Sequence, residues 1–464
     1  MTYDRIIRGG TLATADKVYD ADIGIMGGRI TAIAEELSDP DADIIDASGL
    51  VVAPGGIDVH THFDTGIGES STADDYTSGS RAAAAGGITT FVNFAFQEPG
   101  RGLSAALDRE VGKAAGRSVI DYGFHIAITD LSPPGVLDEL PALVQNGFSS
   151  IKVFTANAGM ALGDPDVLRV LRAAADVDVM VNVHAEDASL IDHLTDELLR
   201  AGHRDVAHLV EARPAQAEAI ATARVAAYAA ALGATVYFVH LSCRSALDAV
   251  RQARRDGSRV YVETRPAYLY LSADRYTLPA REGNKYVCWP PLRTVDDQKA
   301  LWEGLRDGEI QTYATDHTTW LAGQKMDPAL SFAEIPGGVS NVQTSLGMLY
   351  AEGVATKRIS MATFVSVTST NPAKLFGLWP RKGTLAVGSD ADLVLIDPDR
   401  SFRVTEPVMH SRSDFDPYEG YEAHGWPVLT VSRGEVVARD GTITATPGRG
   451  QLLRRGRYQD PEDA

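Results

Sequence analysis

The chain has 464 residues, of which 44% are hydrophobic and 23% charged, a composition typical of a folded globular protein. Its formal net charge of −19 disfavours nucleic acid or an anionic membrane as a partner, because either would need a basic patch. Cys243 and Cys288 are too few for a disulfide framework or a Cys-rich zinc site, and no signal peptide or long apolar span is visible. We therefore expect a cytoplasmic protein that is neither secreted nor membrane-spanning.

Residues 1–54 contain short apolar segments separated by Gly, Asp and Ser, as in YDRIIRGGTLAT at 3–14. Such segments predict strands joined by turns, and so a small β module. Because a chain of this length exceeds what one hydrophobic core usually serves, we expect this module to belong to a smaller domain beside a larger one.

From residue 55 apolar runs alternate with Ala-, Leu- and Arg-rich helical stretches, a pattern typical of a parallel α/β fold. Strand-like runs lie at 57–63, 87–96, 120–128, 149–156, 178–186, 234–242, 259–269 and 310–317. Helical candidates between them include 103–117, 165–176 and 215–233, the last of which ends at a glycine suited to a C-cap. Eight strands with intervening helices predict a (β/α)8 TIM barrel over residues 55–380.

The β pattern returns over residues 381–445, where turn dipeptides such as Asp440-Gly441 separate apolar segments. We expect this part and residues 1–54 to build one β-sandwich domain from both chain ends. Residues 446–464 are interpreted as a peripheral C-terminal tail.

Polar residues with metal-binding chemistry lie at or near the ends of five predicted barrel strands. They are His60 and His62 in GGIDVHTHFD, Lys152 in SSIKVFTA, His184 in VNVHAED, His240 in VHLS and Asp316 in YATDH. Because catalytic residues of such barrels come from the C-terminal ends of the strands, these positions predict one shared site.

Each of these residues also has an ordinary structural interpretation. A His-x-His can satisfy turn carbonyls, His184 or His240 can be hydrogen-bonded near the core, and Asp316 can cap the next helix. Lys152 is harder to explain in this way, because a lysine inside an apolar strand is costly unless it is paired or neutralised. Their joint occurrence at the strand ends of one barrel favours a metal site.

The residue types indicate which metal such a site would hold. Imidazoles and a carboxylate suit zinc, with cobalt or manganese as alternatives. His60 and His62 point to the same side of a strand because side chains alternate, so they can share one ion. A protonated lysine cannot ligate a cation. Lys152 therefore needs modification, and reaction of its neutral amine with CO2 gives a carbamate whose two oxygens can bridge two metals.

Seven motifs, taken in order, resemble the dihydropyrimidinase and hydantoinase group of cyclic amidohydrolases in the amidohydrolase superfamily. They are GGIDVHTHFD, TADDYTSGSRAAAAGGITTFVNF, SSIKVFTA, VNVHAED, VHLS, PPLR and YATDH. The later segment VSRGEVVARDG looks like that group's as well, so the similarity runs nearly end to end.

The resemblance implies a (β/α)8 barrel with a β-sandwich domain and a binuclear metal centre of two divalent ions. By that similarity His60, His62 and Asp316 hold one ion, His184 and His240 hold the other, and carbamylated Lys152 bridges them.

The mechanism that the resemblance implies is metal-dependent hydrolysis of the C–N bond of an amide-type group. A water between two cations becomes acidic enough to supply a bridging hydroxide near neutral pH, and this hydroxide attacks the substrate carbonyl. Asp316 takes the remaining proton as a general base and passes it to the departing nitrogen as a general acid. His317 either orients that carboxylate or the substrate, or is a structural loop histidine.

Three positions of the expected substrate pocket depart from the family pattern. Asn157 replaces a tyrosine, five residues after the bridging lysine, whose hydroxyl helps to stabilise the tetrahedral intermediate. Trp289 replaces a serine before PPLR, and Gly337 replaces the asparagine of an IPNG segment. These changes leave the predicted metal ligands in place but alter the pocket that would hold a ring with two polar edges.

Three functions remain as alternatives. The first is a hydrolase of C–N bonds other than peptide bonds that acts on a cyclic amide, as in dihydropyrimidinases and hydantoinases. The second uses the same machinery on an acyclic or N-substituted carbamate, thiocarbamate or urea. The third is a non-enzymatic scaffold, which competent residues at all six ligand positions disfavour. The expected partners are a small-molecule substrate and further copies of the chain, in a homotetramer by similarity.

Overall fold

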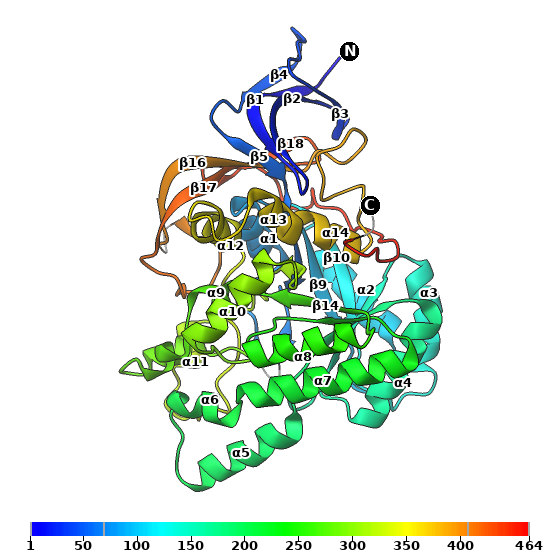
Figure 1. Ribbon diagram of the computed structural model, residues 1–464, viewed down its shortest axis with the longest axis vertical. Helices are drawn as coiled ribbons and strands as arrows, with labels where there is room; N and C mark the ends of the chain where they lie inside the picture. Colours follow the sequence, from blue (N-terminus) through cyan, green and yellow to red (C-terminus); the bar gives the residue numbers. More distant parts are fainter. Residues whose placement is uncertain (1, 68–69, 406–407, 463–464) are drawn as a thin grey trace.

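The computed structural model describes residues 2–67, 70–405 and 408–462. Its larger part is a barrel of parallel strands surrounded by helices, and a mostly antiparallel sheet lies above the barrel in the view of Figure 1. Blue and orange-to-red segments meet in this sheet, because it is built from both ends of the chain. The predicted barrel with a β domain formed by the two chain ends is therefore confirmed.

Eight parallel strands follow one another around the barrel in chain order within the described residues. They are β6 (Gly56–Thr61), β9 (Ile88–Phe96), β10 (Asp121–Ala127), β11 (Ser150–Phe154), β12 (Met180–His184), β13 (Val236–Phe238), β14 (Val260–Thr264) and β15 (Thr312–Tyr313). The last strand returns to the first through Thr315, whose amide and hydroxyl donate to Asp58 over 3.1 Å and 2.5 Å. Each strand overlaps its predicted run, and β6 begins one residue before it, at Gly56. The run 259–269 is shorter as a strand than predicted, because Pro266 begins helix α9 (Pro266–Tyr270).

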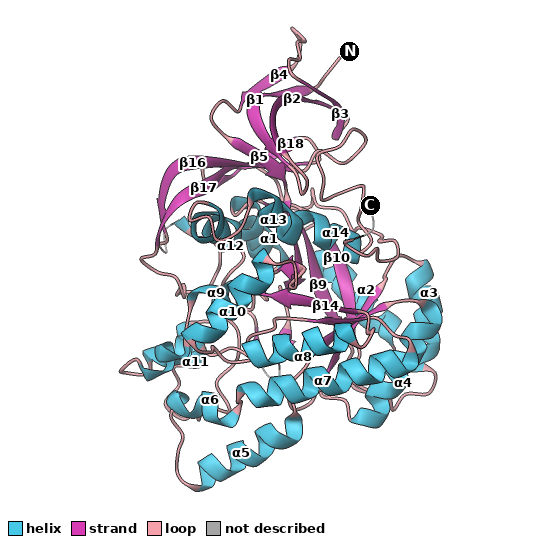
Figure 2. Ribbon diagram, in the orientation of Figure 1, coloured by secondary structure: helices cyan, strands magenta, loops and turns pink. Residues whose placement is uncertain are grey.

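Helices cover the outside of the barrel, as the cyan ribbons around the magenta strands show in Figure 2. The longer ones are α1 (Tyr76–Ala85), α2 (Leu103–Ala114), α4 (Asp164–Val177), α5 (Ala188–Arg200), α7 (Ala215–Leu232), α8 (Arg244–Arg255) and α10 (Val295–Arg306). Shorter ones are α3 (Leu140–Gln145), α6 (Leu209–Ala212), α11 (Ala322–Lys325), α12 (Ser345–Leu349), α13 (Met361–Val365) and α14 (Asn371–Leu375). The three helices predicted from sequence correspond to α2, α4 and α7. Gly233 ends α7 with a φ of 72°, which favours glycine.

The β domain is one nine-stranded sheet in the part of the chain that the structure describes, with the order β19-β18-β17-β16-β5-β1-β2-β3 and β4 paired to β1. Its strands are β1 (Arg5–Ala13), β2 (Val18–Met26), β3 (Arg29–Ala34), β4 (Asp43–Asp46), β5 (Val51–Pro54), β16 (Leu393–Arg403), β17 (Glu422–Ser432), β18 (Glu435–Arg439) and β19 (Thr442–Ile443). Antiparallel pairing of β5 with β16 joins the N-terminal and C-terminal halves. Buried side chains of both halves, such as Ile23 and Leu393, share one hydrophobic core.

Part of the C-terminal tail packs against the barrel, so the prediction that the tail is peripheral is wrong for Leu453 and Arg455, although most of the other tail residues that the structure describes are exposed or half-buried. The amide of Leu453 donates to the carbonyl of Tyr122 over 2.7 Å, and the side chain of Leu453 packs in the core inside the barrel. Arg455 is buried and donates to the carbonyl of Phe124 and the hydroxyl of Ser150. An open barrel end would leave such strand carbonyls and apolar side chains exposed, and the tail covers them.

No helix in the described ranges is long and apolar enough to cross a membrane. Cys243 and Cys288 are both buried and unpaired.

Candidate metal centre

All six predicted metal ligands line one cavity of about 540 Å³ at the C-terminal side of the barrel strands. They are His60, His62, Lys152, His184, His240 and Asp316. The strand ends thus bring together side chains that lie up to half the chain apart in sequence.

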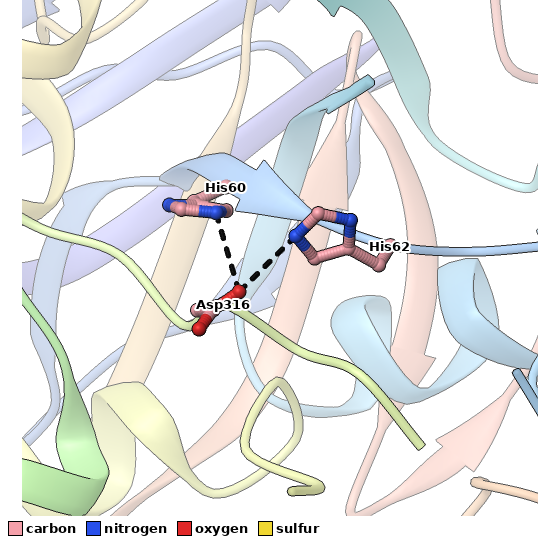
Figure 3. Close-up of side chains that lie close together, drawn as sticks. All are labelled: His60, His62 and Asp316. Carbon is pink, nitrogen blue, oxygen red and sulfur yellow. Dashed lines mark ion pairs between the residues drawn. The ribbon is translucent and has the colours of Figure 1, made fainter. Parts of the chain in front are cut away.

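His60, His62 and Asp316 form the first group of candidate ligands (Figure 3). Oδ1 of Asp316 lies 3.2 Å from Nε2 of His60 and 3.1 Å from Nε2 of His62. One ligand atom from each residue lies within 4.8 Å of the other two, close enough for the three to bind one ion. The two histidines stand at the end of β6, and Asp316 follows β15.

Two side chains at the end of β14 support this group. Oε1 of Glu263 lies 2.6 Å from Nδ1 of His60, so the carboxylate accepts the ring proton and leaves Nε2 free for a metal. Arg265 directly follows β14, is fully buried and donates from Nη1 to Oδ2 of Asp316. The carboxylate of Asp316 therefore turns one oxygen toward the histidines and the other toward the arginine.

His184 and His240 form the second group. Nδ1 of His184 lies 3.0 Å from Nε2 of His240, and both rings are buried. Nε2 of His184 donates to Oε2 of Glu186 over 2.8 Å, which leaves Nδ1 as the unprotonated nitrogen. Arg213 in turn pairs with Glu186, with Nε 3.2 Å from Oε1.

The amine of Lys152 is buried in the same cavity and has no hydrogen-bond partner among the described residues. Burial lowers the pKa of Lys152 to about 7, so a large fraction of the amine is neutral at physiological pH. A neutral amine can react with CO2, and the resulting anion would supply the ligand oxygens that an unpaired lysine lacks. The burial and lowered pKa of Lys152 are compatible with the predicted carbamate, which stays a prediction.

The electrostatics of the site fit bound cations. Burial lowers the pKa of both His184 and His240, which keeps these imidazoles neutral as metal ligands must be. Burial opposes ionisation of Asp316 and Glu186, but electrostatic interaction of Asp316 with His60 and Arg265, and of Glu186 with Arg213, lowers their pKa values overall. Neutral nitrogen donors beside ionised carboxylates are a suitable donor set for zinc or a similar ion.

Three residues of the site have positive φ angles, which residues other than glycine rarely adopt. The values are 41° for His240, 48° for Asp316 and 81° for Asn157. Such a conformation costs about 1–3 kcal/mol per residue and is concentrated at functional sites in proteins. Here it redirects the chain just after strands β13, β15 and β11.

The three residues that depart from the family pattern, Asn157, Trp289 and Gly337, line the wall of the same cavity. Oδ1 of Asn157 accepts from Nη2 of Arg213 over 2.8 Å, and the guanidinium of Arg213 lies 5.1 Å from the ring centre of Trp289. A Cβ at Gly337 would lie 2.9 Å from Cδ2 of Trp289, too close for any side chain. The indole therefore occupies the space that an asparagine at position 337 would need.

His317 does not line the cavity. Its Nε2 lies 2.9 Å from Oδ2 of Asp74, and its Nδ1 accepts from the amides of Asn341 and Val342 over 3.1 Å. These contacts use both ring nitrogens, so the structure favours the structural loop role over contact with substrate.

The comparisons with known proteins agree with this geometry. The model of the amidohydrolase family matches residues 51–437. The chain belongs to the amidohydrolase family. It is 40% identical to the D-hydantoinase of Geobacillus stearothermophilus over 457 residues, which cover 98% of this chain and 97% of that protein. It is 41% identical to the D-hydantoinase of Rhizobium radiobacter, with 98% and 100% covered.

The crystal structure of dihydropyrimidinase from Brevibacillus agri superposes on this amidohydrolase with a TM-score of 0.96, at 40% identity and with 98% and 100% of the two chains covered. The L-hydantoinase of Arthrobacter aurescens is more distant, with a TM-score of 0.90 at 30% identity over 98% and 100% of the chains. The predicted membership in the hydantoinase-like group of amidohydrolases is therefore confirmed.

The sequence analysis does not identify the side chains that hold the candidate ligands of this amidohydrolase in place. Glu263 and Arg265 stand in VYVETRP, where charged residues follow a buried apolar run, and that signal was available. Glu186 stands two residues after His184, but Arg213 lies in a loop with no pattern of its own.

Proposed function

We propose that this amidohydrolase opens the ring of a cyclic amide, such as a hydantoin or a dihydropyrimidine, by hydrolysis. The oxygen of water bonds to the carbonyl carbon, the ring C–N bond breaks, and the departing nitrogen gains a proton. The observation that carries this proposal is the buried amine of Lys152, which has no hydrogen-bond partner among the described residues and lies in one cavity with two histidine groups. The similarity to hydantoinases and a dihydropyrimidinase over nearly the whole chain supports the substrate class.

Two divalent ions, with zinc as the first choice and cobalt or manganese as alternatives, would bind in this cavity. His60, His62 and Asp316 would hold one ion, and His184 and His240 the other. Lys152, carbamylated by CO2, would bridge them. Bound together, the two ions would lower the pKa of a water between them and polarise the substrate carbonyl.

Asp316 moves the proton in this reaction. It accepts a proton from the attacking water as a general base and gives it to the ring nitrogen as a general acid. Contacts to His60, His62 and Arg265 hold the carboxylate in one orientation. Glu186 and Glu263 hold the rings of His184 and His60 so that the unprotonated nitrogen of each faces the cavity.

Asn157, Trp289 and Gly337 form the part of the pocket that faces the substrate. The indole of Trp289 provides an apolar wall, and Asn157 provides a short polar group where the family has a phenol. The comparisons do not favour the acyclic carbamate or urea alternative, because the similar proteins are named for cyclic amides. Competent ligands at all six positions also disfavour the scaffold alternative.

A small organic molecule is the proposed substrate, and the cavity of about 540 Å³ is large enough for a ring with one substituent. A homotetramer and a cytoplasmic location stay predictions that gel filtration with light scattering and cell fractionation would test.

The experiment that tests the proposal is a hydrolysis screen with metal-reconstituted protein. The panel contains hydantoin, 5-phenylhydantoin, dihydrouracil, a cyclic imide, a substituted urea and an aryl carbamate. We expect ring opening of at least one cyclic amide and loss of that activity in chelated protein. Hydrolysis of the carbamate or urea without any ring opening would contradict the proposal in favour of the acyclic alternative.

A further inference from the structure

A second cavity of about 640 Å³ adjoins the metal-site cavity. Asn157 and Trp289 line both, so they form part of the wall between the two spaces. Among the described residues, Arg213 lines the second cavity and not the first, whereas His184 lines the first and not the second. Arg213 therefore lies on the side of Asn157 and Trp289 that faces away from the metal-site cavity.

The contacts of Asn157 fix which end of its amide faces each cavity. Oδ1 accepts from Nη2 of Arg213 over 2.8 Å, and Nδ2 lies 3.3 Å from Nε2 of His184. A guanidinium has only donors, so the opposite orientation would place two N–H groups only 2.8 Å apart, closer than the 3.3 Å between Nδ2 and Nε2 of His184. The amide oxygen therefore faces the second cavity and the amide nitrogen faces the metal-site cavity.

The protons on Nδ2 of Asn157 are available to a ligand. Nε2 of His184 gives its own proton to Glu186 and so cannot accept one from Asn157. No other acceptor within the described ranges takes these protons. The wall therefore presents an N–H donor to the cavity that holds the candidate metal ligands.

Arg213 is itself held in place from several sides. Its guanidinium pairs with Glu186 and lies 5.1 Å from the ring centre of Trp289. Its backbone carbonyl accepts from Nη1 of Arg293, in the PPLR motif, over 2.6 Å. Only 8% of the residue is exposed, so it cannot turn away into solvent without breaking these contacts.

We propose that Arg213 is a positioning residue for substrate recognition, which turns the N–H end of Asn157 toward the substrate and packs behind Trp289. The group it positions would donate to a carbonyl oxygen of the substrate, so a substrate must present an acceptor at that point of the wall. This inference rests on the proposed hydrolysis of a cyclic amide.

The direction of the amide is tested by two substitutions at one position in the zinc-loaded protein, with hydantoin as substrate. Asn157→Ala removes the donor, and we expect kcat/KM to fall about 100-fold, as for loss of one donor in similar sites. Asn157→Asp has the same shape but presents an oxygen to the cavity, so kcat/KM should fall below that of Asn157→Ala. Activity of Asn157→Asp equal to or above that of Asn157→Ala would overturn the proposal.

The dependence on Arg213 is tested by a double-mutant cycle. Arg213→Met should lower kcat/KM about as much as Asn157→Ala, and should add less than threefold when combined with it. Arg213→Lys keeps the charge beside Glu186 and should recover part of the loss, while Arg204→Met serves as a matched control at an exposed arginine. Metal content is measured for every variant, and independent, multiplying losses at positions 157 and 213 would contradict the positioning role.

A crystal structure of Arg213→Met decides the inference without any activity. In Arg213→Met we expect the side chain of Asn157 to leave its position beside His184. In Arg213→Lys we expect it to keep that position, and we expect the protein to bind as much metal as the wild type. An unchanged Asn157 in Arg213→Met would overturn the inference. If wild-type protein hydrolyses none of the panel, the proposed function fails, but this structural comparison still tests the role of Arg213.

Discussion

Arg265 donates to the oxygen of Asp316 that faces away from His60 and His62. Nη2 of the same guanidinium donates to the hydroxyl of Tyr268 over 2.9 Å, and that hydroxyl donates to the carbonyl of Pro290 over 2.6 Å. Because Pro290 follows Trp289, these hydrogen bonds link the candidate general base to the loop that forms the pocket wall. Because Arg265 binds one oxygen of the Asp316 carboxylate, the other oxygen stays turned toward the metal site.

Loss of this support should weaken the first ion more than it disturbs the fold. Arg265→Gln is expected to lower metal affinity or kcat about 10- to 100-fold, as is typical when a residue that holds a metal ligand is removed. Chelator competition measures the affinity, and Arg306→Gln, at an exposed arginine, is the control. Unchanged affinity and kcat in Arg265→Gln would show that Asp316 needs no such partner.

Lys152 should control assembly of the centre in a pH-dependent way. Its pKa is lowered to about 7 by burial, so the neutral fraction that can react with CO2 rises as pH rises through that value. About a tenth of the amine is neutral one pH unit below the pKa and about nine tenths one unit above it. Activation of metal-free protein by zinc and bicarbonate should therefore be much faster at pH 8 than at pH 6.

The matched variants for that experiment are Lys152→Ala, which should lose most activity and part of its metal, and Lys299→Ala, which alters an exposed lysine. Activation of the wild type at a rate independent of bicarbonate, or full metal binding by Lys152→Ala, would argue against a carbamate bridge.

Substitutions at Trp289 and Gly337 should have non-additive effects on kcat/KM. Gly337→Asn places a side chain where the indole lies, with Cβ 2.9 Å from Cδ2, and should lower kcat/KM for any substrate. In a Trp289→Ser background the space is open, so the same change should be tolerated, and the coupling should be about 1–3 kcal/mol. A further change of Asn157→Tyr should shift preference toward dihydrouracil or hydantoin. Additive effects of the first two changes on kcat/KM would mean that the residues do not compete for space.

The tail should contribute to stability rather than to catalysis. Leu453 is 2% exposed in the core inside the barrel, so Leu453→Ala should lower the free energy of unfolding by about 2–5 kcal/mol. Urea unfolding of this variant is compared with Val387→Ala, at a position that is 64% exposed. A loss no larger than that of the control would mean that the tail does not support the barrel.

Much of the fold could be predicted because strands that alternate with helices leave a periodic pattern along the chain. The eight barrel strands and the candidate ligands His60, His184 and Asp316 were found for that reason, since strand ends carry the site in this fold. The packing of the tail cannot be predicted in this way because its sequence is polar and has no period, and the contacts of Leu453 are visible only in the folded barrel.

The supporting residues of the site depend on contacts that no local pattern encodes. Arg213 meets Asn157 across 56 positions of the chain, and Arg265 meets Asp316 across 51. From sequence, Asn157, Trp289 and Gly337 look like three independent exchanges. In the structure they lie on one wall that Arg213 supports, so their effects on specificity are expected to be coupled.

Elemental analysis of metal in protein purified without chelator tests the central claim most directly. The arrangement of the six ligands predicts close to two transition-metal ions per chain, retained through gel filtration. Protein that folds normally but holds no transition metal, even after incubation with zinc and bicarbonate, would contradict the assignment of a binuclear hydrolase.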